Sequence, residues 1–424
     1  MQLLKSSTLL VWPLSVCAIA PASAQYAAFR ALDPAAELEM LADGAVLITP
    51  SSSSVRPGSG RAHTNFHLFH PAGGLPTANA ANAAPPIAGN YNETPASIAC
   101  LYALVPVVTG CNPQHVFAVP SGGGGVIAIV GANHAPNAMA DLNVFSQNFG
   151  LPLVNPASFQ VIYATSAGTT TSTPPSYDSG WEMEISLDVQ WAHAMAPSAK
   201  IILVEANSAN MSDMLAAVSL AGSLVTVGSG GQVSLSWGAS EYFGEATNDS
   251  TFTGSKVVYF AATGDSPGTS YPAASPNVVA VGGTSISRNR TTGNFVSQSA
   301  WSSGGGPSRY EKRPSYQSSI SRTVGSARGI PDVSAVADPN SGVWIYDSAA
   351  GGWIVVGGTS VATPVVAGIT NLRGGGFSVS SNAELTYIYG HQSHYTDITT
   401  GNCRTHRATT NWDFCTGIGV PKGP

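Results

Sequence analysis

The chain has 424 residues, a formal net charge of −6 and only 9% charged residues. So weak and acidic a charge excludes binding to nucleic acid or to an anionic membrane surface through a basic patch. A low carboxylate count also leaves few ion pairs to lose in acid, which suits a chain that stays folded at low pH.

The first 24 residues have the pattern of a secretory signal peptide. Lys5 supplies a positive charge, residues 9–20 are mostly apolar, and residues 22–24 are small, as at a cleavage site. A membrane anchor is the weaker interpretation, because the apolar run is short and contains Pro13. We expect an exported, soluble protein, extracellular or, in a Gram-negative host, periplasmic.

Residues 25–93 show little regular pattern and are expected to form a largely irregular leader or short pro-segment with a linker. Residues 51–54 are all serine, and residues 71–86 are rich in proline, glycine and alanine. Three histidines lie close together here, but a metal site is not favoured without a rigid scaffold to hold them. These histidines are His63, His67 and His70.

Residues 94–424 are expected to form a single large α/β domain. Strand-like apolar runs alternate with helical stretches, which predicts right-handed crossovers and a mainly parallel sheet with helices on both faces. The expected strands lie at residues 126–130, 161–163, 201–204, 233–237, 257–260 and 278–281, and the expected helices at 138–149, 181–196 and 211–224.

The cysteines suggest two short disulfide loops. Cys17 leaves with the signal peptide, and the other four form two close pairs. Cys100 with Cys111, and Cys403 with Cys415, would each close a short loop in an exported protein. A zinc site is the alternative, but no Cys-x-x-Cys spacing or adjoining histidine pattern supports it.

The helix expected at residues 181–196 carries two carboxyl groups on the side that should be buried. Glu184 and Asp188 are spaced i, i+4, so both project from one face, with apolar residues around them. Two close, desolvated carboxyls should keep a proton well above the usual pKa, which suits acid–base work in acid. The alternative is an ordinary solvated pair, and Glu182 is expected to be solvated.

A strand followed by a sharp turn and a buried helix is predicted around Ser360. Apolar residues 353–356 precede the glycine pair 357–358, and the apolar run 365–369 follows. A serine presented here would meet free N–H groups at the positive end of the helix dipole. An ordinary N-cap hydroxyl is the alternative explanation.

The motifs taken together resemble the sedolisins, the serine-carboxyl peptidases. The Gly-Thr-Ser-x-x-x-Pro motif at residues 358–364 resembles the nucleophile motif that subtilisins and sedolisins share. The subtilisin histidine motif is absent, residues 130–133 lack the subtilisin aspartate, and His193 fits a structural histidine near a helix end. The resemblance covers about residues 94–421. The other matching motifs are Glu184-x-x-Leu187-Asp188, residues 234–238, and Gly264-Asp265-Ser266 with residues 271–276.

The resemblance implies a role for each matching residue. Ser360 would be the nucleophile and Glu184 its general base and acid, while Asp188 would orient Glu184 and share its proton. Asp265 would donate to the oxyanion when protonated, although a turn residue would also explain its place. The strand that would pair with the substrate backbone consists of Ser236, Trp237 and Gly238.

The resemblance also implies one Ca²⁺ ion near the C-terminus. Carboxylates and backbone carbonyls are the oxygen ligands that this ion takes. The family usually has glycine at two of the carbonyl positions, where this chain has Thr409 and Asn411. The implied ligands are the side chains of Asp397 and Asp413 and the carbonyls of Ile398, Thr409 and Asn411.

The expected function is that of a secreted serine-carboxyl endopeptidase, a hydrolase acting on proteins or peptides in acid. A tripeptidyl-peptidase of the same family is the alternative, and a catalytically dead binding module is a third. We expect a monomer that binds neither nucleic acid nor membrane. Sedolisins typically carry a folded pro-domain, so a short irregular leader puts an inhibitory propeptide in question.

Overall fold

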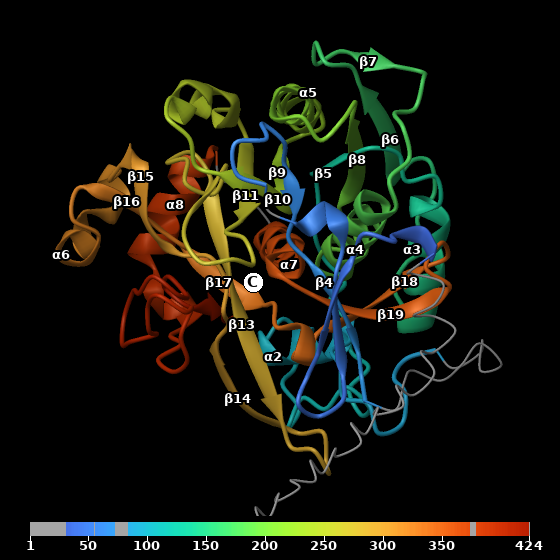
Figure 1. Ribbon diagram of the computed structural model, residues 1–424. Helices are drawn as coiled ribbons and strands as arrows, with labels where there is room; N and C mark the ends of the chain where they lie inside the picture. Colours follow the sequence, from blue (N-terminus) through green and yellow to red (C-terminus); the bar gives the residue numbers. More distant parts are fainter. Residues whose placement is uncertain (1–30, 55, 73–83, 374–378, 424) are drawn as a thin grey trace, which may run out of the picture.

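A nine-stranded sheet forms the centre of the molecule (Figure 1), in the order β14-β13-β11-β9-β5-β8-β6-β7 with β17 paired to β13. A computed structural model describes residues 31–54, 56–72, 84–373 and 379–423. Strand β14 pairs antiparallel with β13, and β7 pairs antiparallel with β6. The other pairings are parallel, which confirms the predicted mainly parallel sheet. The strands are β5 (Val126–Ala132), β6 (Phe159–Ala164), β7 (Thr170–Thr171), β8 (Lys200–Ala206), β9 (Gly231–Leu235), β11 (Val257–Ala262), β13 (Val279–Arg288), β14 (Phe295–Ala300) and β17 (Val333–Val336).

Helices cover both faces of this sheet, and each face has its own hydrophobic core. Side chains alternate along a strand, so Ile127 and Ile129 of β5 pack in the core that includes helices α3, α4 and α7. Val126 and Ala128 face the opposite core, which includes α5. The helices are α2 (Pro95–Leu101), α3 (Ala138–Phe149), α4 (Ser179–Met195), α5 (Met211–Val227), α6 (Ser321–Val324), α7 (Thr359–Leu372) and α8 (Ser381–Gly390).

The stretch before residue 94 differs from its prediction. Residues 25–93 were expected to be largely irregular, yet the described part contains four strands: β1 (Glu37–Met40), β2 (Val46–Thr49), β3 (His63–Thr64) and β4 (His67–His70). A second sheet, of five strands, has the order β1-β2-β4-β19-β18 and contains β18 (Val343–Asp347) and β19 (Gly352–Gly357). Strands β3 and β4 pair with β10 and β19, which are distant in sequence and leave no local signal. Strands β1 and β2 pair with each other, and this local hairpin was missed as well.

Shorter elements complete the fold. Strand β10 pairs with β12 on one side and with β3 on the other. The remaining strands are β10 (Trp237–Ser240), β12 (Ser270–Tyr271), β15 (Gly306–Lys312), β16 (Ala327–Ile330), β20 (Tyr395–Thr396) and β21 (Val420–Pro421). The 3₁₀ helices are η1 (Ser51–Ser53), η3 (Glu245–Phe252), η4 (Ser315–Ile320), η5 (Pro339–Ser341) and η6 (Gln392–His394).

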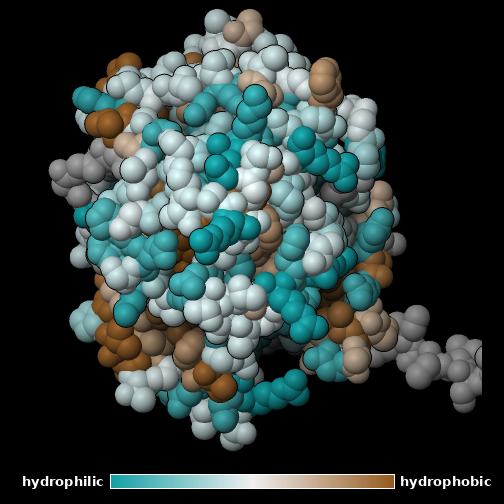
Figure 2. Space-filling view, turned by 90° about the vertical axis from the view of Figure 1, so that its left-hand side faces the viewer, coloured by the Kyte–Doolittle hydropathy of each residue, from teal (hydrophilic) through white to brown (hydrophobic). Residues whose placement is uncertain are grey.

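Both predicted disulfides are present, Cys100–Cys111 and Cys403–Cys415. Hydrophilic residues dominate the face shown in Figure 2, with apolar residues in small groups among them. Among the described residues, none of the helices combines the length and the apolar character that crossing a membrane requires. The predicted signal peptide, residues 1–24, lies outside the described residues.

Candidate active site

Ser360 lies in the first turn of α7, immediately after a sharp turn out of β19. Gly358 makes this turn with a φ of 129°, a conformation that side chains rarely allow. A Cβ at Gly358 would lie 2.1 Å from the carbonyl oxygen of Asn65 and 2.6 Å from Oδ2 of Asp265. Glycine is therefore required both for the turn and for the space in front of Ser360.

The hydroxyl of Ser360 is within hydrogen-bond distance of a carboxylate. Oγ lies 2.9 Å from Oε2 of Glu184 and also 2.9 Å from the carbonyl oxygen of Ser236. One hydroxyl proton serves one acceptor well, so Ser360 can donate to Glu184 or to the carbonyl. Helices α4 and α7 pack against each other in one core, which holds these side chains in register.

Glu184 and Asp188 are both fully buried on α4. Burial raises the pKa of Glu184 well above its usual range, and the nearby charge of Asp188 raises it further. Burial likewise raises the pKa of Asp188. The hydroxyl of Ser236 donates to Oδ1 of Asp188 at 2.6 Å, so this carboxyl is held by a group from the neighbouring strand end.

Asp265 is placed so that one of its oxygens is free. The backbone N–H and the hydroxyl of Thr359 both donate to Oδ1, each at 2.8 Å. Oδ2 is buried and has no hydrogen-bond partner among the described residues, although Nε2 of His67 lies 3.5 Å away. Burial raises the pKa of Asp265 to about 7. Since Oδ1 already accepts two bonds, a proton on this carboxyl belongs on Oδ2.

Histidine takes no part at the hydroxyl of Ser360, whose hydrogen-bond partners in the described chain are Glu184 and backbone groups. His193 is buried near the end of α4, where its Nε2 lies 2.8 Å from the carbonyl oxygen of Pro152. His193 is therefore a structural histidine, as its position near a helix end indicated.

The strand expected to pair with substrate is already paired with the chain itself. In β10, Trp237 lies opposite Thr64, and Gly238 lies opposite His63, in antiparallel register. The indole of Trp237 donates to the carbonyl of Val130 at 2.9 Å and anchors this strand. One edge of β10 can therefore hold an extended peptide beside Ser360.

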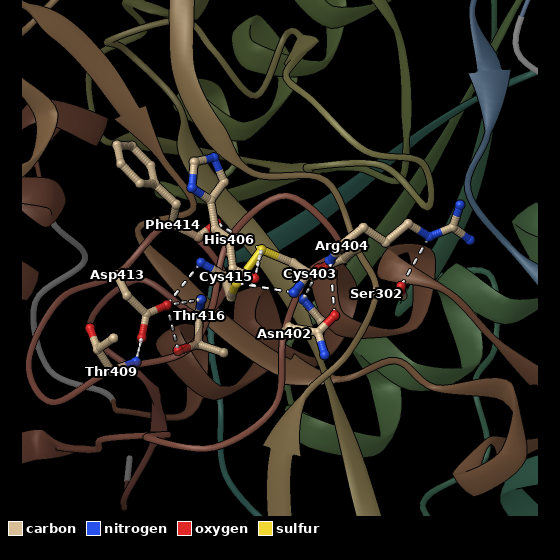
Figure 3. Close-up of a disulfide and its surroundings, with 12 residues drawn as sticks. Ser302, Asn402, Cys403, Arg404, His406, Thr409, Asp413, Phe414, Cys415 and Thr416 are labelled. Atoms are coloured by element: carbon tan, nitrogen blue, oxygen red, sulfur yellow. Dashed lines mark hydrogen bonds between the residues drawn. A yellow bond between two sulfur atoms is a disulfide. The ribbon is translucent and has the colours of Figure 1, made fainter.

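Asp413, one of the two carboxylates of the expected calcium site, lies near the second disulfide (Figure 3). The N–H of Thr409 donates to Oδ2 of Asp413, and the N–H of Asn411 donates to Oδ2 of Asp397, each at 2.8 Å. Oδ1 of Asp397 is buried and has no hydrogen-bond partner among the described residues. Asn411 has a φ of 64°, the left-handed region that glycine favours and asparagine tolerates.

A second group of buried carboxyls was not expected. Glu182, expected to be solvated, is 1% exposed, and one oxygen from each of Asp141, Glu182 and Asp347 lies within 4.8 Å of the other two. The expectation was wrong because both α3 and β18 pack on this face of α4, which the helical period alone could not show.

Comparisons with known proteins identify the family of this chain. The family described as "Subtilase family" matches residues 164–419. The chain belongs to the subtilase family. Kumamolisin from Bacillus sp. (strain MN-32) is 31% identical over 303 residues, which cover 62% of this chain and 53% of kumamolisin. Sedolisin from Pseudomonas sp. (strain 101) is 36% identical over 170 residues, 35% of this chain and 28% of sedolisin.

These relatives place this subtilase on the sedolisin branch, although the chain spans about half or less of the curated relatives' length. Among solved structures, Pseudomonas sedolisin complexed with two molecules of pseudo-iodotyrostatin superposes with a TM-score of 0.62 at 24% identity. That match covers 78% of this chain and 95% of the sedolisin chain, and it shows that the fold is shared.

Three parts of this subtilase's site were missed from the sequence. Thr359 holds Asp265, the side chain of Ser236 holds Asp188, and Asn65 contacts Ser360 through its backbone. The first lies within the Gly-Thr-Ser motif and could have been considered. The other two depend on contacts between distant segments, which the sequence does not show.

Proposed function

We propose that this subtilase is a secreted serine-carboxyl endopeptidase that hydrolyses peptide bonds in acid. The observation that carries the proposal is the 2.9 Å contact between Ser360 Oγ and Glu184 Oε2, made at the N-terminus of a buried helix. A carboxylate here has the place of a base, and the helix N-terminus favours negative charge near the nucleophile.

In the proposed acylation, Glu184 takes the proton of Ser360 as Oγ attacks the substrate carbonyl. Asp188 holds a proton at this moment, since two close buried carboxyls do not both ionise readily. The N–H of Ser360 and the protonated Oδ2 of Asp265 face the developing oxyanion. Glu184 then gives its proton to the leaving nitrogen, and water hydrolyses the ester with the same carboxyl as base.

The pairing of β10 with the chain segment at His63 and Thr64 favours endopeptidase activity over tripeptidyl-peptidase activity. A tripeptidyl-peptidase would close the cleft past the third residue on the amino side of the cut. Here the chain paired with β10 continues beyond His63, and Ala62 donates its N–H to the carbonyl of Ala209 at 2.8 Å. The cleft therefore has room for a bound chain that extends past the third residue on the amino side of the cut.

Calcium is part of the proposal. Asp397 and Asp413, with the carbonyls of Ile398, Thr409 and Asn411, suit a hard cation that takes oxygen ligands. The unpartnered buried oxygen of Asp397 supports this assignment, because a buried carboxylate oxygen needs a partner. The ion would tie the two loops together.

Calcium removal tests this assignment through stability. We expect excess chelator to lower the melting temperature and added Ca²⁺ to restore it, because a ligand of the folded state stabilises that state by mass action. Asp397→Asn should show a low melting temperature that no longer responds to chelator. A melting curve that chelator leaves unchanged, with no metal on elemental analysis, would remove calcium from the proposal.

The proposed activity is tested by digesting an unfolded protein at several pH values and sequencing the product ends. We expect internal cuts in acid, none with Ser360→Ala, and declining activity toward neutral pH. Release of tripeptides alone would favour the tripeptidyl-peptidase alternative. Absence of cleavage at every pH would favour a binding module.

A further inference from the structure

Residues 65–67 show where the residues of a bound substrate would lie along the candidate active site. The N–H of Ser360 donates to the carbonyl oxygen of Asn65 at 3.0 Å, so this carbonyl lies in the place that an attacked carbonyl would take. The second residue after Asn65 is His67, which lies opposite Gly357 in the antiparallel pairing of β4 with β19. The side chain of His67 therefore marks the subsite for the second residue after the cut.

An aromatic and a cationic residue lie at this subsite. Both line a cavity of about 480 Å³ together with His67 and Ser302. The indole of Trp301 meets the ring of His67 edge-on, with the ring centroids 6.5 Å apart. Burial and then the positive charge of Arg404 lower the pKa of His67 to about 4. The charge of Arg404 therefore acts on the side chain at this position, where it opposes a cation and attracts an anion.

The guanidinium of Arg404 is available to a ligand. Its Nε donates to Oγ of Ser302 at 3.0 Å (Figure 3), which fixes the plane of the group. Within the described chain, its terminal nitrogens have no hydrogen-bond partner, and Arg404 makes no ion pair. A guanidinium held in this way presents its remaining N–H groups to a carboxylate, which it can bind through two parallel hydrogen bonds.

The loop that carries Arg404 is held in place next to Trp301. The disulfide Cys403–Cys415 staples this loop, and the N–H of Ala300 donates to the carbonyl of Thr400 at 2.8 Å. Arg404 itself has a φ of 65°, which is uncommon for a residue with a side chain. A residue held in such a conformation points to a use for its side chain.

The carboxyl groups that line the same cavity do not neutralise Arg404. The proton proposed on Oδ2 of Asp265 leaves that carboxyl neutral in acid. Both oxygens of Asp338 already accept hydrogen bonds from other groups. Glu37 and Glu39 of β1 are exposed, and neither makes an ion pair with Arg404 in the described chain.

We propose that Arg404, with Trp301 and Ser302, forms a subsite that prefers glutamate or aspartate as the second residue after the cut. The inference rests on the proposed function and adds a substrate preference to it. The guanidinium binds the substrate carboxylate, and the indole packs beside the aliphatic part of the same side chain. Lysine or arginine at this substrate position is disfavoured, because its charge is repelled by Arg404.

The test begins by sequencing the product ends of a digested unfolded protein, which identifies bonds that the enzyme cuts. Three peptides built around one such bond then differ only at the second residue after the cut, which is glutamate, glutamine or lysine. At about pH 5, where glutamate is largely ionised, we expect kcat/KM to be about two- to fivefold higher for glutamate than for glutamine, as for an exposed ion pair. Lysine should give the lowest value. The advantage of glutamate should shrink in about 1 M salt, which screens exposed charges.

Variants of the loop assign the preference to one residue. Arg404→Gln should remove the advantage of glutamate, chiefly through KM, and Arg404→Glu should favour the lysine peptide instead. Arg407→Gln, on the same loop, is the matched control and should keep the wild-type preference. Melting curves verify that each variant is folded.

The outcomes separate this inference from the proposed function. If the wild type cuts the glutamate and glutamine peptides equally well, or if Arg404→Gln keeps the preference, the inference fails and the proposed function stands. If Arg407→Gln loses the preference as fully as Arg404→Gln, a general charge effect replaces the subsite. If neither the unfolded protein nor any of the peptides is cut, the proposed function fails and the inference fails with it.

Discussion

Helix α4 carries carboxyl groups of two buried clusters, and their comparison shows what distinguishes the candidate catalytic one. Glu184 and Asp188 face α7, whereas Glu182, two residues away, faces Asp141 and Asp347. Burial raises the pKa in both clusters, that of Glu182 to about 10. A strongly raised pKa therefore does not by itself identify a catalytic group.

The two clusters differ in the hydrogen-bond partners of their carboxyl groups. Asp141 accepts the N–H and hydroxyl of Ser348, each at 3.0 Å, and Asp347 accepts the N–H of Ala350 at 2.8 Å. These donors tie the cluster to a loop. Glu184 instead meets a hydroxyl at a helix N-terminus, with an unpartnered carboxyl oxygen of Asp265 nearby. Within the described chain, the proposed nucleophile and the proposed oxyanion donor both lie on the side of Glu184.

The largest expected effect separates the two clusters by activity. Glu184→Gln should reduce turnover about 10²–10⁴-fold, since a general base of this kind contributes that much. Glu182→Gln, on the same helix, is the matched control and should retain turnover near that of the wild type. Steady-state rates on an unfolded protein substrate measure both. Equal losses of turnover in the two variants would show that Glu184 has no catalytic role that Glu182 lacks.

A smaller loss is expected from the oxyanion donor. Asp265→Ala should lower turnover about 10²–10³-fold, the usual cost of one such donor. Asp265→Asn keeps a donor that does not titrate, so it should retain partial activity with its upper pH limb moved toward neutral. Wild-type turnover for the alanine variant in acid would leave Asp265 as a turn residue only.

The smallest expected effect is on stability, and it tests the cluster formed by Glu182, Asp141 and Asp347. The pKa of Glu182 is raised from 4.5 to about 10, so the folded chain keeps a proton that the unfolded chain loses above pH 4.5. The free energy of unfolding should therefore fall as pH rises from 4.5 toward 10. Glu182→Gln removes this titration, so its melting temperature should exceed that of the wild type at neutral pH and match it in acid.

Melting curves of the two proteins across this pH range make the measurement. If both lose stability in parallel as the pH rises, Glu182 titrates normally and the cluster does not hold a proton.

Much of the fold could be predicted because local patterns determined it. The apolar runs of β5, β8 and β11 and the long helix α4 lie where the residues indicated. The environment of Glu182 could not be predicted, because the elements that bury it come from distant parts of the chain. Strands β3 and β4 were missed for the same reason, since the edges with which they pair belong to residues 237–240 and 352–357.

The candidate site also has residues that the sequence could predict and contacts that it could not. Ser360, Glu184, Asp188 and Asp265 could be proposed from motifs, because each motif keeps its chemistry within a few residues. That Thr359 pins one oxygen of Asp265 required the structure. The contact of Asn65 with Ser360 joins segments 295 residues apart, which no local pattern reports.

The pH dependence of kcat/KM distinguishes chemistry driven by carboxyl groups, as proposed here, from chemistry driven by a histidine. The measurement follows digestion of an unfolded protein substrate from about pH 3 to about pH 8. Burial raises the pKa of Asp265 to about 7, so its donating form is lost as pH rises through that value. We expect a maximum in acid and a steep decline toward neutral pH. Activity that instead rises through neutral pH to a plateau, as a histidine base would give, would contradict it.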